Sequence, residues 1–131
     1  PEIVRNYLAY HPDFPAKFIA QENAGAHLTI NRGTALAQGH YITILNSDDR
    51  FEPDRLITLY ETLIATGQGL CFTNFEAIDE HSRAIDPARN PYVRNLQRSD
   101  ARAMGLPSVG HALFKFNVTI TTGNHFFTRE L

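Results

Sequence analysis

The sequence has no tryptophan, one methionine and one cysteine among its 131 residues. A single cysteine cannot close a disulfide within the chain, so a disulfide-stapled secreted scaffold is excluded. Because Cys71 stands in the apolar run Leu70-Cys71-Phe72, we expect its thiol to pack in the core. No apolar run approaches the roughly 20 residues that a membrane helix needs, and no secretory leader pattern opens the sequence. We therefore expect a cytoplasmic protein, with peripheral association at the inner face of the membrane left open.

The chain also lacks an excess of charge of either sign. The 12 Lys and Arg residues are set against 14 Asp and Glu residues, which gives a formal net charge of −2 at pH 7. The basic residues are scattered rather than striped, so a nucleic-acid partner is not expected. With 43% hydrophobic and 20% charged residues, the composition is typical of one globular domain.

Helical and strand patterns alternate along the chain. Hydrophobic periodicity predicts helices at 3–8, 28–38, 53–66 and 99–104, and strands at 17–20, 41–45, 70–75 and 125–128. Residues 76–86 are predicted as a hairpin-like excursion, residues 89–98 as a loop, and residues 111–116 as either helix or strand. Pro53 is expected in the first turn of its helix and Gly67 just past the end. Strands that alternate with helices indicate an α/β fold, and we expect a mostly parallel sheet flanked by helices.

The polar turn Asn46-Ser47-Asp48-Asp49 follows the most apolar predicted strand. In α/β sheets ligands bind beyond the carboxyl ends of the strands, so this turn is the leading candidate site. Two adjacent carboxylates can offer hard oxygen ligands to Mg²⁺ or Mn²⁺, which in turn can bridge a diphosphate. A solvated turn that caps the next helix explains the same residue types equally well.

A second acidic turn contains Asp79 and Glu80, which are candidates for a general base by residue type alone. A polar hairpin tip explains these two residues at least as well. The six histidines include no pair at the three- or four-residue helical spacing of many zinc sites, so no zinc site is expected.

A series of short motifs between residues 21 and 56 resembles the family 2 glycosyltransferases. The motifs are Gln21-Glu22-Asn23-Ala24-Gly25, Ile30-Asn31-Arg32-Gly33, the stretch 37–49, and Glu52-Pro53-Asp54-Arg55-Leu56. Members of that family commonly read E-N-x-G, N-x-G, A-x-G-E-Y-I followed by D-x-D-D, and P-D-R-L, in this order. Residues 122–131 are similar to the family's later acceptor-side strand. The resemblance implies a glycosyltransferase A fold, of which this chain would be the central fragment.

The resemblance also implies a function and a set of site residues. It implies transfer of a sugar from a nucleotide-diphosphate donor, with a UDP-sugar as the first expectation, to a glycan, lipid or protein acceptor with inversion. Asp48 matches the last carboxylate of the D-x-D motif, which holds Mn²⁺ or Mg²⁺ on the diphosphate, and Asp49 would support the turn or the sugar. Asn46 replaces the first Asp of the motif, which keeps an oxygen and loses the charge. Gly25 and Asn31 match positions near the donor pocket, although structural roles in a turn and a helix explain them as well.

The family's first apolar strand, its nucleotide-binding turn and its general base have no counterpart in this sequence. No catalytic residue is therefore assigned, residues 1–131 are interpreted as a single truncated domain, and this chain alone is expected to be inactive. Two other functions stay open. One is a non-catalytic domain of the same fold that binds a glycan or a protein. The other is a phosphotransfer or phosphatase domain, which would lack a glycine-rich phosphate cradle.

Overall fold

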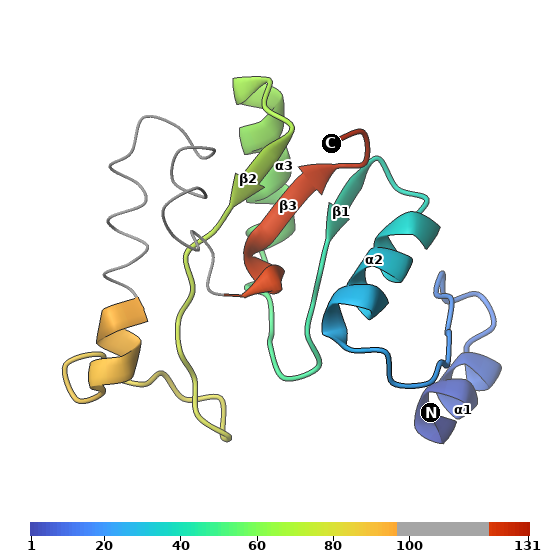
Figure 1. Ribbon diagram of the computed structural model, residues 1–131, viewed down its shortest axis with the longest axis horizontal. Helices are drawn as coiled ribbons and strands as arrows, with labels where there is room; N and C mark the ends of the chain where they lie inside the picture. The colour runs from blue at the N-terminus through green and yellow to red at the C-terminus, as the bar shows by residue number, and fades with distance from the viewer. Residues whose placement is uncertain (97–120) are drawn as a thin grey trace. The chain divides into compact units, whose positions relative to one another are not determined.

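The computed structural model describes residues 1–96 and 121–131, which form two compact units, Pro1–Leu36 and Ala37–Leu131. Figure 1 shows the helices and strands of both units. The predictions for residues 99–104 and 111–116 lie outside the described residues. The interpretation of the chain as a truncated single domain stays a prediction.

The first unit contains two helices, α1 (Glu2–Tyr10) and α2 (Ala26–Leu36), which confirms both predicted helices. Neither helix has a buried residue. The predicted strand at residues 17–20 is wrong, because the segment between the helices is irregular. An apolar run becomes a strand only where a partner strand can pair with it. Phe18 instead lies against the guanidinium of Arg5, whose central carbon is 5.5 Å from the ring centre.

The second unit is built around a sheet of three described strands in the order β1-β3-β2. These are β1 (Tyr41–Thr43), β2 (Leu70–Phe72) and β3 (His125–Thr128), within three of the four predicted strands. The strand that comes last in the sequence, β3, lies between the other two and is antiparallel to both (Figure 1). Strands β1 and β2 therefore run in the same direction, and their carboxyl ends lie at one edge of the sheet.

The expectation of a mostly parallel sheet is not confirmed, because both strand pairings among the described residues are antiparallel. The alternation of strands and helices indicated crossover connections, which join parallel strands. Hydrophobic patterning locates a strand without giving its direction, and the insertion of β3 between β1 and β2 depends on pairings over long sequence distances.

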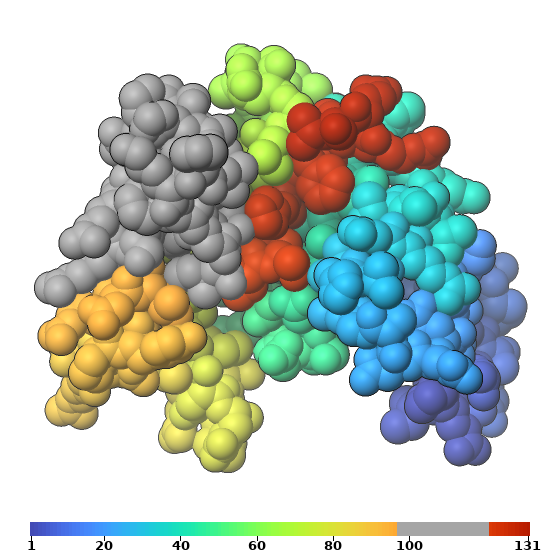
Figure 2. Space-filling view, in the orientation of Figure 1, coloured from blue at the N-terminus to red at the C-terminus, as the bar shows by residue number. Residues whose placement is uncertain are grey.

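Helix α3 (Arg55–Thr66) packs on one face of this sheet. Its residues Leu59 and Leu63 are buried in a cluster with Phe126 of β3, and the ring of Tyr41 stacks on that of Phe126 with centroids 5.5 Å apart. Cys71 packs against the same cluster, as predicted, and its Sγ lies 3.6 Å from the carbonyl oxygen of Leu59. In Figure 2 the red atoms of β3 are visible on the face of the sheet turned away from α3.

The predicted end of α3 is confirmed, and its predicted start is wrong. Gly67 adopts a left-handed conformation with φ of +64°, and its N–H donates to the carbonyl of Leu63 at 2.9 Å. Pro53 lies before the N-cap residue Asp54 rather than in the first turn. The first helical residue is therefore Arg55, whose side chain reaches the sheet, as described below.

Two further segments follow β2. Residues 76–86 form the predicted hairpin-like excursion, in which Ile78 and Ala84 make an antiparallel bridge. Residues 91–96 are helical, so the predicted loop over 89–98 is wrong there. The sequence signal for this helix is Asn90, a residue type that caps helix starts. Its Oδ1 atom accepts hydrogen bonds from the N–H groups of Tyr92 and Val93 at 3.1 and 3.2 Å.

Candidate functional site

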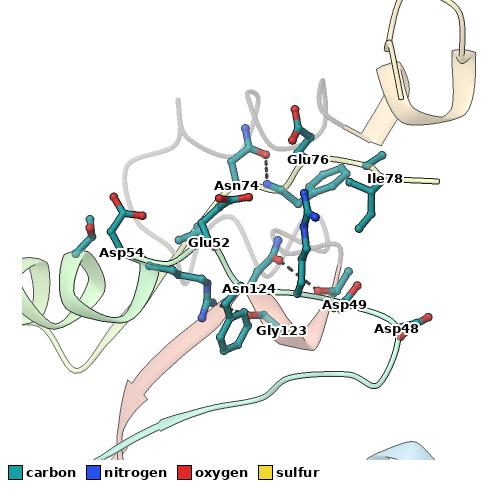
Figure 3. A pocket seen from close by; sticks show the side chains of 17 residues that line it. Asp48, Asp49, Glu52, Asp54, Asn74, Glu76, Ile78, Gly123 and Asn124 are labelled. Carbon is teal, nitrogen blue, oxygen red and sulfur yellow. Dashed lines mark hydrogen bonds between the residues drawn. The ribbon is translucent and has the colours of Figure 1, made fainter. Parts of the chain in front are cut away.

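A pocket opens at the edge of the sheet where β1 and β2 end and β3 begins (Figure 3). Its volume is about 580 Å³, within the roughly 300–1,000 Å³ of typical small-molecule sites. Three segments supply its described lining, residues 48–58 after β1, 73–78 after β2, and 121–124 before β3. The pocket therefore lies at the carboxyl ends of two strands, where the sequence placed the leading candidate site.

The Asn46 amide organises the turn that enters this pocket. Its Nδ2 donates to Oδ2 of Asp49 at 2.6 Å, and its Oδ1 accepts from the hydroxyl of Thr122 at 3.3 Å. Thr122 is 76 residues away in the sequence, so the turn is tied to the segment that precedes β3. An Asp at position 46 could not donate to a second carboxylate. The departure from the family's first Asp therefore has a local physical reason.

Asp48 and Asp49 both line the pocket. Figure 3 shows Asp48 at the margin, with its carboxylate directed away from the other labelled side chains. In residues 1–96 and 121–131, no group of three or more His, Cys, Asp and Glu side chains is arranged to hold a metal ion. Mg²⁺ in phosphate-transfer sites commonly uses one or two protein carboxylates together with substrate phosphates and water. A single exposed carboxylate such as Asp48 fits that mode of binding, and its role as a metal ligand stays a prediction.

Arg55 joins three elements at the pocket. Its Nη1 donates to Oγ1 of Thr43 in β1 at 3.2 Å, and its Nη2 donates to the carbonyl of Gly123 at 2.5 Å. The Thr43 hydroxyl in turn donates to the carbonyl of His125 at 2.8 Å. The Arg55 guanidinium also lies over the ring of Phe51, 4.0 Å from its centre. One side chain thus connects the start of α3 with β1 and with the segment that precedes β3.

The surroundings of Arg55 change the acid–base properties of two groups. Partial burial lowers the pKa of Arg55, and the nearby Cys71 opposes that shift. Burial raises the pKa of the Cys71 thiol, and Arg55 opposes that shift in turn. A guanidinium remains protonated at physiological pH in either case, so Arg55 is a permanent cation at the pocket.

Sequence reasoning did not assign three carboxylates of the pocket to the site, although two of them stand in a motif that it quoted. They are Glu52, Asp54 and Glu76. Together with Asp48 and Asp49, they outnumber the two basic residues that line the described part of the pocket. The signal that could have found them is position: two follow β1 and one follows β2, at the edge where ligands of α/β sheets bind.

The segment before β3 supplies a buried amide. Asn124 is 6% exposed, and its Oδ1 accepts from the hydroxyl of Thr121 at 3.2 Å. Its carbonyl accepts from the N–H of Thr73, which follows β2, at 3.1 Å. Its Nδ2 is buried and has no hydrogen-bond partner among the residues that the structure describes. The sequence identified this region only as a strand, because nothing in the letters Thr122-Gly123-Asn124 locates their partners.

Asp79 and Glu80 do not line the pocket. The Asp79 carboxylate accepts hydrogen bonds from the N–H groups of His81 and Arg83 at 2.8 and 3.0 Å, and it pairs with the Arg83 side chain at 2.8 Å. These contacts, led by the backbone N–H of Arg83, lower the pKa of Asp79. A lowered pKa makes a carboxylate a weaker base. The structure therefore favours the hairpin-tip interpretation over a role as general base.

Gly25 and Asn31 lie in the first unit. Gly25 has a φ of +84°, a backbone conformation that favours glycine, and its carbonyl accepts from both the N–H and the hydroxyl of Thr29. Asn31 is exposed on α2. Gly25 thus has the structural role in a turn that the sequence left open, and the donor-binding roles of both residues stay predictions.

Several curated proteins are similar to about half of the chain. The chain is 36% identical over 63 residues to the uncharacterized glycosyltransferase YibD of Escherichia coli. It is 32% identical over 75 residues to the succinoglycan biosynthesis protein ExoO of Rhizobium meliloti. It is 29% identical over 66 residues to the putative teichuronic acid biosynthesis glycosyltransferase TuaG of Bacillus subtilis. These matches cover 48, 56 and 50% of this chain, and only 17, 22 and 26% of the respective relatives.

No solved structure matches the chain. In the part of the chain that the structure describes, no helix has the length and apolar character needed to cross a membrane. Residues 1–123 match the family described as Glycosyl transferase family 2, whose members have the glycosyltransferase A fold. The chain therefore belongs to glycosyltransferase family 2.

Proposed function

We propose that the protein containing this family 2 chain transfers a sugar from a nucleotide-diphosphate donor to a glycan, lipid or protein acceptor, with inversion at the anomeric carbon. The observation that carries the proposal is the pocket at the carboxyl ends of β1 and β2, with the Asp48-Asp49 turn in its lining. Two of the relatives are named for succinoglycan and teichuronic acid biosynthesis, which supports a glycan as the acceptor. A UDP-sugar is the proposed donor.

The residues of the pocket have separable tasks in this proposal. Asp48 would share Mg²⁺ or Mn²⁺ with the diphosphate of the donor. When bound, such an ion stabilises negative charge on the departing nucleotide diphosphate. Asp49, held by the Asn46 amide, fixes the turn that presents Asp48. Arg55 ties the start of α3 to Gly123 in the segment that precedes β3.

A non-catalytic domain that binds a glycan or a protein is the second candidate. Asn46 favours it, because an amide contributes no charge to a metal site and this one is already bonded to Asp49 and Thr122. Binding without donor turnover is the property that separates this candidate from the transferase.

Hydrolysis of the donor tests the proposal. The protein expressed from the complete gene is incubated with UDP-glucose, UDP-galactose and UDP-N-acetylglucosamine, in Mn²⁺ and again in excess chelator, and release of UDP is measured. The proposal expects release from at least one donor in Mn²⁺ and little release in chelator. Glycan binding by a folded protein that releases no UDP from any of these donors would favour the second candidate. Equal release of UDP in Mn²⁺ and in chelator would contradict the metal dependence and would leave the proposed sugar transfer standing.

A further inference from the structure

The amide of Asn124 has an unused hydrogen-bond donor at the pocket. Backbone contacts hold the residue from two sides, since its N–H donates to the carbonyl of Thr121 at 3.2 Å and its carbonyl accepts from the N–H of Thr73 at 3.1 Å. The hydroxyl of Thr121 occupies Oδ1. Within residues 1–96 and 121–131, Nδ2 has no hydrogen-bond partner. Folded proteins pair nearly all buried polar groups, so an unpaired one calls for an explanation such as a bound ligand or water.

Carboxylates line the same pocket as this donor. Figure 3 shows the Asn124 amide among the lining side chains, with Glu52, Asn74 and Glu76 on the side away from the sheet. Two arginines line the described part of the same pocket; Arg55 is already bonded to Thr43 and Gly123, and Arg50 is exposed. The described lining thus combines one unpaired donor with five carboxylates and two arginines, so negative charge predominates.

This combination suits a hydroxyl better than an anion. A sugar hydroxyl can accept a hydrogen bond from Nδ2 and at the same time donate one to a neighbouring carboxylate. A carboxylate or phosphate oxygen can only accept, and it would be repelled by Glu52 and Glu76. Discrimination by a misplaced like charge is a common source of binding specificity.

We propose that Asn124 binds a hydroxyl of the transferred sugar through Nδ2, and that the pocket selects an uncharged sugar over one that carries a carboxylate. The proposal rests on the proposed function and narrows it to a class of donor. It makes Asn124 a ligand-binding residue, one that the motif resemblance did not single out.

Binding of three probes to the complete protein tests it. UDP, UDP-glucose and UDP-glucuronic acid are titrated in Mn²⁺ by calorimetry, with the wild type and with Asn124→Asp. The substitution keeps the shape of the side chain and the oxygen that Thr121 uses, and it replaces the donor by an acceptor. Asn90→Asp is the matched control, since it makes the same chemical change at an amide that does not line the pocket and whose Oδ1 accepts from the N–H groups of Tyr92 and Val93. Asn124→Leu serves if the Asp variant does not fold.

We expect the wild type to bind UDP-glucose about tenfold more tightly than UDP-glucuronic acid. A difference of this size in affinity is what the loss of one hydrogen bond or the addition of one like charge typically causes. Asn124→Asp should lose about tenfold in affinity for UDP-glucose relative to UDP, and Asn90→Asp should leave that ratio unchanged. Unaltered affinity of UDP shows that a variant is folded.

Three results would overturn the inference in distinguishable ways. Equal affinities of the wild type for the two UDP-sugars would remove the selectivity. An equal loss in both Asp variants, or no loss in either, would remove the role of Asn124 and leave the proposed function standing. Failure of the wild type to bind UDP and UDP-glucose would contradict the proposed donor class itself, and the inference would fall with it.

Discussion

Two acidic turns of the second unit, Asn46–Asp49 and Asp79–Arg83, have similar residue types and different connections. In the first, Asn46 bonds to Thr122, a residue 76 positions later. In the second, the contacts of Asp79 that hold the turn are made to His81 and Arg83, within four positions. Only the first turn contributes to the pocket. Composition alone made both turns candidates for acid–base or metal chemistry, and long-range bonding separates them.

The difference has a physical meaning. A turn held by its own backbone and neighbouring side chains can be altered with little effect on the rest of the fold, because no other element depends on it. A turn bonded to a distant segment fixes the relative position of two walls of a pocket. Exchanging the same residue types in the two turns should therefore give unequal effects on activity and stability.

The largest expected difference concerns turnover. Asp48→Ala in the complete protein should lower metal-dependent release of UDP from its donor by about a hundredfold or more, since charge stabilisation of the leaving group would be lost. Asp79→Ala is the matched change in the other turn and should leave turnover within about twofold, because Asp79 does not line the pocket and its contacts are local. The two rates are measured side by side at saturating Mn²⁺, with circular dichroism as the check of folding. Near-normal turnover by Asp48→Ala would refute its metal role.

Stability should show the next largest difference. Arg55→Met removes hydrogen bonds from a charged donor to Thr43 and Gly123, and we expect a loss of about 1–2 kcal/mol in the free energy of unfolding after allowance for partial exposure. Arg83→Met makes the same exchange in the second turn, where Arg83 pairs with Asp79 at the surface. Its effect should be clearly smaller, as is usual for exposed ion pairs. Urea denaturation of both variants measures the two losses. Equal losses would mean that the long-range hydrogen bonds of Arg55 stabilise the fold no more than the surface ion pair of Arg83 does.

The same contrast explains how much of the fold could be predicted from the sequence. The helix now labelled α3 was predictable because Leu59 and Leu63 recur on one face and Gly67 ends it, all of them local signals. The strand at residues 125–128 was also predicted. Its position between β1 and β2 was not, because pairing partners 53 to 87 residues apart leave no mark in a single sequence. The strand expected at residues 17–20 failed for the same reason, since apolar character does not supply a partner.

The candidate site divides in the same manner. Asp48 and Asp49 could be found because they follow an apolar strand in a motif that resembles a known family. Arg55 was noted only as part of that motif, and its bonds to Thr43 and Gly123 needed the folded chain. Asn124 lies within residues 122–131, which resemble the family's acceptor-side strand, but nothing singles it out there, because its unpaired Nδ2 is a property of its surroundings.

Asn46→Asp in the first turn should have an effect on stability of intermediate size. The new carboxylate would lie against Oδ2 of Asp49, which now accepts a hydrogen bond from Asn46 at 2.6 Å. Loss of that bond and the added repulsion should cost about 1 kcal/mol of unfolding free energy at pH 7. Asn90→Asp is the control, because Asp caps a helix as well as Asn does. Denaturant unfolding at pH 7 and at pH 3 measures both variants, and the Asn46→Asp deficit should shrink at the lower pH. A stability unchanged at pH 7 would show that the amide does not hold Asp49.

The smallest effect is expected from the pH dependence of the second turn. The backbone N–H and then the side chain of Arg83 lower the pKa of Asp79 below its ordinary value of 3.8. A carboxyl group with a lowered pKa in the folded state stabilises the fold above its ordinary pKa, and this stabilisation is lost as the pH falls through the folded pKa. Asp79→Asn should therefore be slightly less stable than the wild type at pH 7, and the difference should vanish as both are titrated towards pH 2. Asp79 lies at a hairpin tip and its contacts are local. The loss of unfolding free energy in Asp79→Asn at pH 7 should therefore be smaller than that in Asn46→Asp. A larger change would mean that the second turn supports more of the fold than its local contacts indicate, and the contrast between the two turns would fail.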